Sequence, residues 1–512
     1  MRENNNQQNN NIMRNVNKVV LMFPNQAWFK FDLTTTWNLS PYVLCLLGEI
    51  LIRRGYSIKI IDCQFYNMSE EEFKKELEDY QPDLVGISIL TTEYADTADI
   101  AARITKEVDP QIITIMGGVH PTTQHKRVMR NKDIDYACRG EAEVVFPQFL
   151  DWLNARAEFP DKGIVYRDDL GNVVALPPEY IHDLDALPRP NYSLIDFEAY
   201  TMTGPRYGVD TIQVFPYARM LTSRGCPVGC SFCQVESISG KAWRHHSAER
   251  VVDDLKWLKK EYGIKGFIFE DDNAFATKFR TRKMLALLKE ADLNLQWKAA
   301  GVTIWTMDKE ILRLMAETGC QMLGIAIETG TNRVMNDVIG KPVDLKKIIP
   351  MIKYASDELG IFIGANFIIG FPGESWEEIR TTLHYAETCG VDYIKVYPAQ
   401  PLIGTRLYDM AVEMDAIVGD HEAVGWRYGR MRSTEFNQKD ISILRVYEWD
   451  RINFTDPVKR ARTAKIMGIS EKKLDQIRRN TRNKLTFEDF DWSSIDTSLD
   501  EITDNRTKAF SE

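Results

Sequence analysis

Three cysteines on one short stretch carry the strongest chemical signal in this sequence. Cys226, Cys230 and Cys233 lie in LTSRGCPVGCSFC (221–233) with the spacing CxxxCxxC, and Phe232 directly precedes the third thiol. Three thiolates on one loop suit a cuboidal [4Fe–4S] cluster, whose fourth iron then has no protein ligand. Because such an iron can bind a small molecule directly, the spacing predicts a reactive site rather than a simple electron relay.

Two other roles for these thiols fit the sequence less well. A structural zinc site would need a fourth Cys or His at regular spacing, and His245 and His246 lie too far downstream for that. A disulfide would be out of place in a chain without a secretion signal. The other cysteines lie in apolar or helical segments, as reduced core thiols do: Cys45, Cys63, Cys138, Cys320 and Cys389.

The cysteine spacing, with the aromatic residue before the third thiol, resembles the signature of the radical S-adenosylmethionine (SAM) superfamily. In that superfamily the open iron chelates the amino and carboxylate groups of SAM. One electron from the cluster then cleaves SAM into methionine and a 5′-deoxyadenosyl radical, which abstracts hydrogen from an unreactive carbon. The resemblance implies that Cys226, Cys230 and Cys233 are the catalytic metal ligands and that Phe232 lies at the cofactors.

The region around the cysteines has the pattern of a partial barrel. After the strand that precedes Cys226, strands are expected at 267–273, 295–301, 322–330, 362–373 and 393–401, each separated by a helix. Six such units predict a TIM-like partial (β/α)6 barrel over 216–408. Ser247 should cap the helix after the cysteine loop, and Gly263 should end it. The active-site residues of such barrels gather at the carboxyl ends of the strands.

Polar residues follow several of these strands, and the resemblance implies roles for four of them. Asp272, in the acidic run EDDN, falls where the family contacts the methionyl amine of SAM, although such a run is also typical of a solvated helix start. Glu328 in IETG is a candidate for the hydroxyls or ammonium of SAM. Gly370 in IIGFPG fits the strand that meets the adenine. Gln400 ends the sixth strand on the substrate side.

The N-terminal region has the pattern of a buried parallel sheet. Short Val- and Ile-rich runs alternate with helical segments, with strands expected at 18–24, 57–63, 83–89, 112–118 and 135–140. Five such units predict a flavodoxin-like, doubly wound domain over 17–155. Such a domain binds ligands at the carboxyl ends of its strands, but its fold does not say which ligand.

Three loops at these expected strand ends narrow the choice of ligand. Alone, the Gly-Gly pair in GGVHPT (117–122) is typical of an ordinary strand-to-helix turn. Together with RGE (139–141), and upstream of the radical SAM motif, it resembles the cobalamin-binding domain of the cobalamin-dependent radical SAM enzymes. This resemblance covers about residues 18–450. It implies that the loops hold the nucleotide tail of cobalamin through Ser88, Thr91, Gly117, Gly118, His120, Pro121, Gly140 and Glu141.

One motif of other cobalamin proteins is absent. The DxHxxG sequence, whose His coordinates cobalt from below, does not occur, and the loop NQAWFKFDLTTTWNLSP after the first strand contains no His. We therefore expect no protein nitrogen below the cobalt. His120 is expected to contact the nucleotide tail or to cap the following helix, not to ligate the metal.

The remaining segments complete the domain organisation. We expect a disordered polar tail at 1–16, a linker with little secondary structure at 156–215, a mostly helical C-terminal domain at 409–500 and a disordered tail at 501–512. The C-terminal domain should close the barrel. Its candidates for substrate contact are Trp449, Arg451 and Asn453.

Composition limits the partners of the chain. A formal charge of −10 over 512 residues argues against nucleic acid, which needs clustered positive charge. No apolar run approaches the roughly 18 residues that span a bilayer, and the N-terminus has no signal-peptide pattern. We expect a cytoplasmic enzyme with a small-molecule substrate and an external electron donor of the flavodoxin or ferredoxin type.

The resemblance implies a C-methyltransferase that acts on an unactivated sp3 carbon of a small-molecule or natural-product substrate. It would use a [4Fe–4S] cluster, SAM and cobalamin, through the 5′-deoxyadenosyl radical and methylcobalamin. Two alternatives stay open. One is radical ring formation or oxidation without methyl transfer, as in the porphyrin cyclase branch. The other is a cofactor-sensing protein without turnover, against which the intact cysteine triad and the acidic cluster weigh.

Overall fold

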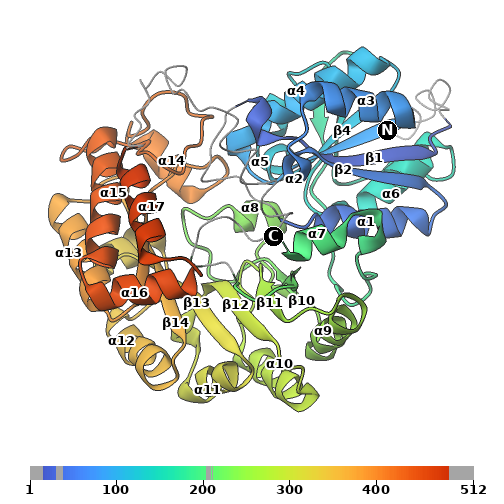
Figure 1. The fold of residues 1–512 in the computed structure, drawn as a ribbon. Coiled ribbons are helices and arrows are strands. Elements are labelled where there is room, and N and C mark those ends of the chain that lie inside the picture. The colour runs from blue at the N-terminus through green and yellow to red at the C-terminus, as the bar shows by residue number, and fades with distance from the viewer. Residues whose placement is uncertain (1–14, 30–38, 203–208, 210–211, 484–512) are drawn as a thin grey trace.

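The chain forms two α/β regions and a C-terminal set of helices (Figure 1). The computed structural model describes residues 15–29, 39–202, 209 and 212–483. The expected tail at 501–512 lies outside these residues. So does most of the tail expected at 1–16, but Val16 is 2% exposed and donates its backbone N–H to Asn154 at 2.9 Å. Val16, which falls within the expected tail, is therefore packed into the N-terminal region.

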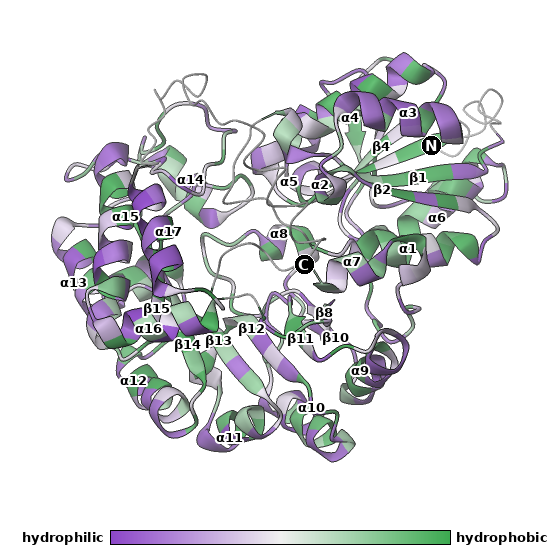
Figure 2. Ribbon diagram, in the orientation of Figure 1, coloured by the Kyte–Doolittle hydropathy of each residue, from purple (hydrophilic) through white to green (hydrophobic). Residues whose placement is uncertain are grey.

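The N-terminal sheet has the doubly wound topology that the sequence predicts. Its strand order is β2-β1-β3-β4-β5-β6-β7, and the pairs among β1 to β5 are parallel. These strands are β1 (Lys18–Phe23), β2 (Ser57–Asp62), β3 (Leu84–Ile89), β4 (Ile113–Gly118) and β5 (Tyr136–Cys138). The helices are α1 (Tyr42–Ile52), α2 (Cys63–Tyr66), α3 (Glu70–Tyr80), α4 (Ala95–Val108), α5 (Val119–Val128) and α6 (Ala142–Leu153). Apolar clusters cover both faces of the sheet, which explains why its strands are continuous hydrophobic runs (Figure 2).

The expectation of a linker with little secondary structure at 156–215 is wrong. Strands β6 (Ile164–Arg167) and β7 (Val173–Ala175) extend the N-terminal sheet in antiparallel pairing. Ile164 and Val165 are fully buried, so this hairpin covers the edge of β5 that would otherwise be open. The short helix α7 (Phe197–Met202) follows.

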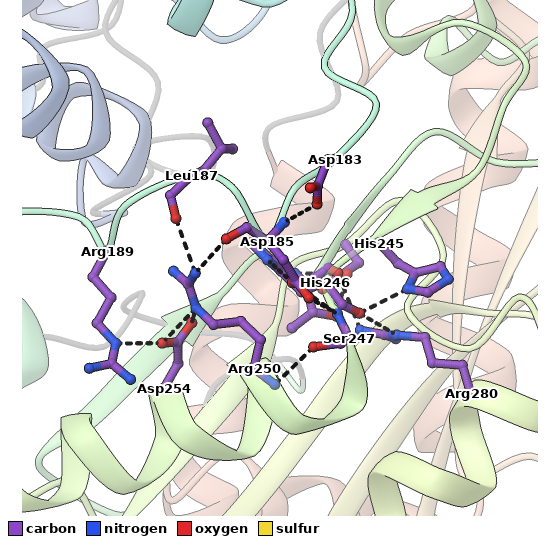
Figure 3. Close-up of polar contacts among 12 residues, drawn as sticks. Asp183, Asp185, Leu187, Arg189, His245, His246, Ser247, Arg250, Asp254 and Arg280 are labelled. Atoms are coloured by element: carbon purple, nitrogen blue, oxygen red, sulfur yellow. Dashed lines mark hydrogen bonds and ion pairs between the residues drawn. The ribbon is translucent and has the colours of Figure 1, made fainter.

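The stretch 183–189 of this segment is fastened to the barrel (Figure 3). Asp185 accepts hydrogen bonds from the backbone N–H of Ser247 at 3.0 Å and from Nδ1 of His246 at 3.0 Å. Arg250 donates to the carbonyls of Asp185 and Leu187. Ser247 is also the N-cap of α9 (Ala248–Tyr262), and Gly263 ends that helix in the left-handed conformation, as predicted. The stretch around Asp185 and Leu187 is thus hydrogen-bonded to the start of α9.

The second α/β region is a partial barrel of six parallel strands, as predicted. Their order is β15-β14-β13-β12-β11-β8. The strands are β8 (Tyr217–Met220), β11 (Gly266–Phe269), β12 (Gln296–Val302), β13 (Cys320–Glu328), β14 (Phe362–Ile369) and β15 (Tyr393–Pro398). The helices that follow α9 are α10 (Lys278–Ala291), α11 (Lys309–Glu317), α12 (Leu345–Lys353), α13 (Trp376–Thr388) and α14 (Arg406–Glu413).

The C-terminal helices complete this open barrel. They are α15 (Gln438–Phe454), α16 (Pro457–Ile466) and α17 (Glu471–Asn483), and α17 is mostly hydrophilic (Figure 2). The side chain of Asn453 accepts from the N–H of Ile394 at 2.7 Å and donates to its carbonyl at 2.9 Å, so α15 satisfies the edge of β15 as another strand would. At the amino end of the strands, Met322 and Phe362 pack with Ile466 and Met467. No helix among the described residues is long and apolar enough to cross a membrane.

Candidate active site

The cysteine loop lies between the barrel and the N-terminal sheet. It is preceded by β9 (Ser223–Arg224) and followed by α8 (Val235–Ser239) and β10 (Arg244–His245), and α8 lies between the two α/β regions (Figure 1). Cys226, Cys230 and Cys233 are free and half-buried. The carboxamide of Asn273 points its nitrogen at the sulfur of Cys226, at 3.6 Å. The three thiols are therefore gathered at the carboxyl end of β8, where a barrel holds its reacting groups.

The surroundings of the thiols are dense and largely apolar. Burial raises the pKa of Cys230 to about 11 and that of Cys233 to about 12. Cys230 and Phe232 pack against an apolar cluster that includes Phe371, and the two phenyl rings have centroids 6.3 Å apart. Cysteine ligands that are partly packed against apolar side chains fit an iron–sulfur cluster that must be shielded from water.

Among the residues that the structure describes, no three His, Cys, Asp or Glu side chains are placed to hold one metal ion together. A cuboidal cluster does not need such convergence, because each of its cysteines binds a different iron. The donor chemistry of the loop thus agrees with a cluster.

The acidic run after β11 is divided among different partners. Glu270 forms an ion pair with Arg219. One oxygen of Asp271 accepts from Thr222 and Ser223 at 2.6 to 2.9 Å, directly beneath the cysteine loop. Because each acid has its own environment, the run is neither a solvated helix start nor three acids around a single cation.

Asp272 is the member of this run that faces open space. Its side chain is exposed to solvent, and yet burial is the main cause that raises the pKa of its carboxyl group. Such a combination is typical of a residue in the wall of a cavity. One carboxylate oxygen accepts from the N–H of Gly225 at 3.1 Å, next to the first cysteine. Asp272 is thus available to a cationic group near the cluster.

Glu328 lies at the carboxyl end of β13 in an unusual backbone conformation, with φ of +78°. Its carboxylate pairs with Lys341 at 2.9 Å, and the side chains are 7% and 3% exposed. The ammonium of Lys341 also lies 4.6 Å from the ring centre of Trp305. Positive φ in a non-glycine residue at a strand end marks a position held by its surroundings, as functional sites often are. Lys341 was missed by sequence reasoning, because only the fold brings it to Glu328.

Gly370 ends β14 and needs to be glycine, since its φ is +84° and an added Cβ would meet Ile441 at 3.0 Å. Its N–H donates to the buried carboxylate of Glu374 at 2.7 Å. Gln400 does not have the free side chain expected of a substrate contact. Its amide accepts from Gly425 and donates to the carbonyl of Tyr428, so it braces a C-terminal loop.

A pocket opens at the carboxyl ends of β1, β2 and β3 in the N-terminal sheet. Ser88 and Thr91 line it, as expected, together with residues that sequence reasoning missed. Among these, the buried Nε2 of Gln64 and Oε1 of Gln26 have no hydrogen-bond partner within the residues that the structure describes. Asp62 lines the same pocket, where burial raises its pKa to about 6 and Tyr200 donates to it at 2.8 Å. Unpaired buried donors and acceptors fit a polar ligand that would satisfy them.

The two glycines after β4 serve different purposes. Gly118 has φ of +102°, and a Cβ there would lie 2.3 Å from the carbonyl oxygen of Ile89. At Gly117 an added Cβ would meet no atom of the described residues within 4 Å, so the backbone is accessible on this side. This open stretch of backbone fits the close approach of a large cofactor at the same edge as the pocket.

His120 and Pro121 are buried in the first turn of α5. Burial and the nearby Arg127 lower the pKa of His120 to about 4, so its imidazole is neutral at ordinary pH. Its Nδ1 has no hydrogen-bond partner in the described part of the chain, where this nitrogen does not cap the helix.

Gly140 and Glu141, two of the predicted cofactor contacts, make close contacts within the protein. A Cβ on Gly140 would lie 2.5 Å from the carbonyl of Glu179, so this glycine allows close packing. Both carboxylate oxygens of Glu141 accept from Arg244 of the barrel, each at 2.7 Å. One of them also accepts from the N–H of Ile181 at 2.7 Å. With its oxygens engaged in this way, Glu141 joins the two α/β regions.

The three C-terminal substrate candidates also make contacts within the protein. Asn453 satisfies the edge of β15, and Trp449 donates to the hydroxyl of Tyr393 at 2.8 Å. Arg451 lies at the surface in ion pairs with Glu387 and Glu448. Tyr393 and Ile394 begin β15, so Trp449 and Asn453 lie toward the amino end of the barrel, opposite the cysteine loop. The sequence does not reveal this position, because the amphipathic pattern of α15 does not say which end of β15 the helix contacts.

Each of the two α/β regions matches a known protein family. Residues 220–386 match the Radical SAM superfamily, and residues 37–150 match the B12 binding domain. An uncharacterized methyltransferase of Pyrococcus horikoshii is 31% identical over 80% of this chain and 86% of its own length. The cytidylyl-2-hydroxyethylphosphonate methyltransferase of Streptomyces wedmorensis is 30% identical over 77% and 81%. The structure of the cobalamin-dependent SAM radical enzyme OxsB with aqua-cobalamin shares the fold, with a TM-score of 0.68 at 16% identity over 96% of this chain and 76% of that one.

The fold and site define an enzyme that combines a cobalamin-binding domain with a radical SAM barrel. The chain belongs to the cobalamin-dependent radical SAM enzymes, whose cofactors are a [4Fe–4S] cluster, SAM and cobalamin.

Proposed function

We propose that this enzyme transfers a methyl group to an unactivated sp3 carbon of a small-molecule substrate. The observation that carries the proposal is that two relatives at 30% identity or more, each aligned over more than four-fifths of its length, are both named methyltransferases. The cluster with SAM supplies hydrogen abstraction, and cobalamin supplies the methyl group.

In this proposal the protein holds and shields the reacting groups. Cys226, Cys230 and Cys233 hold the cluster, and the apolar packing of Phe232 excludes water from it. Asp272 takes the amine of SAM, and the buried pair of Glu328 and Lys341 orients its other polar groups. Gly370 leaves room for the adenine at the end of β14.

The cobalamin would lie at the carboxyl edge of the N-terminal sheet. Ser88 and Thr91 line the pocket for its nucleotide tail, and Gly117 and Gly118 let the backbone approach it. His120 and Pro121 support this loop from within. We take the cobalamin-binding unit to be 17–155 with the β6–β7 hairpin added, and the barrel to be 216–408.

An external donor of the flavodoxin or ferredoxin type would supply the electron. All eight cysteines are free thiols, which agrees with a reducing compartment such as the cytoplasm.

Products from deuteromethyl SAM test the proposal. The reconstituted enzyme is incubated with reductant, labelled SAM and a metabolite extract as the pool of acceptors, and products are identified by mass spectrometry. We expect one S-adenosylhomocysteine and one 5′-deoxyadenosine for each molecule that gains a CD3 group. The Cys226→Ala, Cys230→Ala, Cys233→Ala triple variant is the control and should give none of these products.

The same experiment separates the alternatives. Ring formation or dehydrogenation with deoxyadenosine but no CD3 group would favour a cyclase. A relative of that kind is the anaerobic magnesium-protoporphyrin IX monomethyl ester cyclase of Rubrivivax gelatinosus, which is 26% identical over 73% of this chain. Bound cofactors with neither SAM-derived product would indicate a sensor.

A further inference from the structure

Four buried charges join the two cofactor-binding regions at the cysteine loop. Glu141 and Glu143 lie at the start of α6 in the N-terminal region, and Arg224 and Arg244 lie on β9 and β10 of the barrel region. Their side chains are 8%, 2%, 16% and 6% exposed. The two glutamates and two arginines together carry no net formal charge, and they are largely shielded from solvent.

The contacts within this group are direct. Arg244 binds both oxygens of Glu141 at 2.7 Å, in the two-pronged geometry that fixes orientation as well as distance. Arg224 binds Glu143 at 2.5 Å and lies 3.3 Å from Glu141. Arg244 also donates to the carbonyls of Ile181 and Ser239. It therefore links the segment that precedes the barrel, and the end of α8, to Glu141.

These contacts lie next to the cysteine loop in the sequence. Arg224 precedes Cys226 by one intervening residue, Gly225, whose φ is +79° and whose Cβ would lie 2.5 Å from the carbonyl of Ala242. After Cys233 the chain enters α8, which packs against α5, the helix that follows the Gly-Gly loop. Both ends of the cysteine loop are therefore fastened to the N-terminal region (Figure 1).

Stability alone does not explain a buried network of this kind. Burying charges costs desolvation free energy, and a well-packed apolar group of the same volume often stabilises a fold equally well or better. Hydrogen-bonded ion pairs instead specify one relative position of the parts that they join. Two reacting centres held by different domains require such a specification, since small misplacements of reacting groups lower rates steeply.

We propose that Glu143 with Arg224, and Glu141 with Arg244, are positioning residues that set the distance and orientation between the iron–sulfur cluster and the cobalamin. The proposal rests on the proposed assignment of the two cofactor sites. The four residues contact neither cofactor in this proposal and act through the cysteine loop. When the network is loosened, SAM cleavage should continue while the methyl group and the substrate carbon no longer meet.

The test uses the full chain with both cofactors bound. Glu143→Gln removes one charge, and Glu143→Asp keeps the charge but shortens the side chain by one methylene. Glu422→Gln is the matched control, since Glu422 also links the regions, through Arg130 at 3.4 Å, but lies at the surface. Pulsed electron paramagnetic resonance, on samples poised to contain cob(II)alamin and the reduced cluster, reports the magnetic interaction of the two centres and needs no substrate.

We expect both Glu143 variants to retain iron and cobalamin but to show a weaker or more broadly distributed magnetic interaction. The ratio of deoxyadenosine to methylated product should rise by about 10-fold or more in Glu143→Gln and less in Glu143→Asp. Glu422→Gln should match the wild type. If Glu143→Gln does not fold, the same two measurements are made on Glu143→Asp and on the double variant Glu143→Gln, Arg224→Gln, in which both charges are removed.

Wild-type magnetic interaction and product ratio in every folded variant would overturn the proposal. Failure of the proposed function looks different. In that case the wild-type enzyme would hold both cofactors and show the interaction, and the variants would still change it, but no methylated product would form.

Discussion

At the scale of single residues, the site is organised by side chains whose environments differ although their types are the same. Asp271 and Asp272 are neighbours in sequence, and Asp271 is buried beside Thr222 and Ser223 while Asp272 is exposed and accepts from Gly225. Cys230 and Cys233 have raised pKa values because they are buried, so a metal is needed to hold them as thiolates. The chemistry is therefore set by position as much as by residue type.

The cysteine triad gives the first prediction. Replacing Cys226, Cys230 and Cys233 together with Ala should abolish the iron–sulfur absorbance and all SAM cleavage, because the ligands are removed. Cobalamin binding should persist, since the N-terminal pocket is intact. Visible absorption, iron content and bound cobalamin measure this. Cys320→Ala, at a buried thiol in β13, is the control and should keep its cluster. A cluster that survived the triple substitution would refute the assignment.

Glu374 gives a prediction on pH. Burial raises its pKa to about 8, against hydrogen bonds from Gly370 and Phe371 that favour the charged form. The folded protein thus retains a proton that the unfolded chain releases above its ordinary pKa. Stability should fall as the pH rises from about 5 to about 8 and then level off. Glu374→Gln should remove this part of the dependence in melting curves taken across that range. An unchanged slope in the variant would contradict the raised pKa.

At the scale of elements, the open barrel is completed by a helix. The edge strand β15 has backbone groups without a seventh strand, and Asn453 of α15 satisfies two of them. Arg445, on the same helix, donates to the carbonyl of Val396 at 3.0 Å. A partial barrel avoids an exposed edge in this way, and α15 is a structural part of the catalytic domain.

Substituting Asn453 tests this role. Asn453→Leu has a similar volume but leaves the N–H and carbonyl of Ile394 buried and unpaired, which should cost about 2–4 kcal/mol of stability. Arg451→Ala, on the exposed face of the same helix, should cost less than about 1 kcal/mol. Urea unfolding measures both. A fully stable Asn453→Leu enzyme that has lost only its affinity for substrate would restore the substrate-contact hypothesis.

At the scale of the whole molecule, the two α/β regions are joined by ion pairs that differ in their exposure to solvent. The network of Glu141, Glu143, Arg224 and Arg244 is buried at the cysteine loop. The contact of Glu422 with Arg130 is at the surface, where the Arg130 side chain is 70% exposed. Exposed ion pairs are screened by salt and contribute little.

This difference in exposure gives the last prediction. Glu422→Gln should change the free energy of unfolding by less than about 1 kcal/mol. The small effect should vanish at high salt, because ions already screen the pair. Thermal unfolding at low and high salt measures it. A loss of several kcal/mol, or one that persists in high salt, would mean that the surface contact holds the regions together.

The sequence alone determined the features that depend on neighbours along the chain. Cysteine spacing, the alternation of apolar strands with helices, and the caps of α9 are local patterns, so the cysteine loop and the two α/β regions followed from them. The pair of cofactors was implied by the resemblance of the motifs to a known family. Gly118 was recognisable for the same reason, because a positive φ favours glycine at one position.

Only the tertiary structure decided the roles that depend on distant partners. Glu141 and Arg244 are 103 residues apart, and nothing in either neighbourhood says that they meet. Lys341 reaches Glu328, and Asn453 reaches the edge of β15, only because particular elements pack together. A charged or amide side chain can bind a ligand, a neighbouring domain or an open strand edge with the same atoms. Which of these it does is fixed by the partner that the fold brings within hydrogen-bond distance.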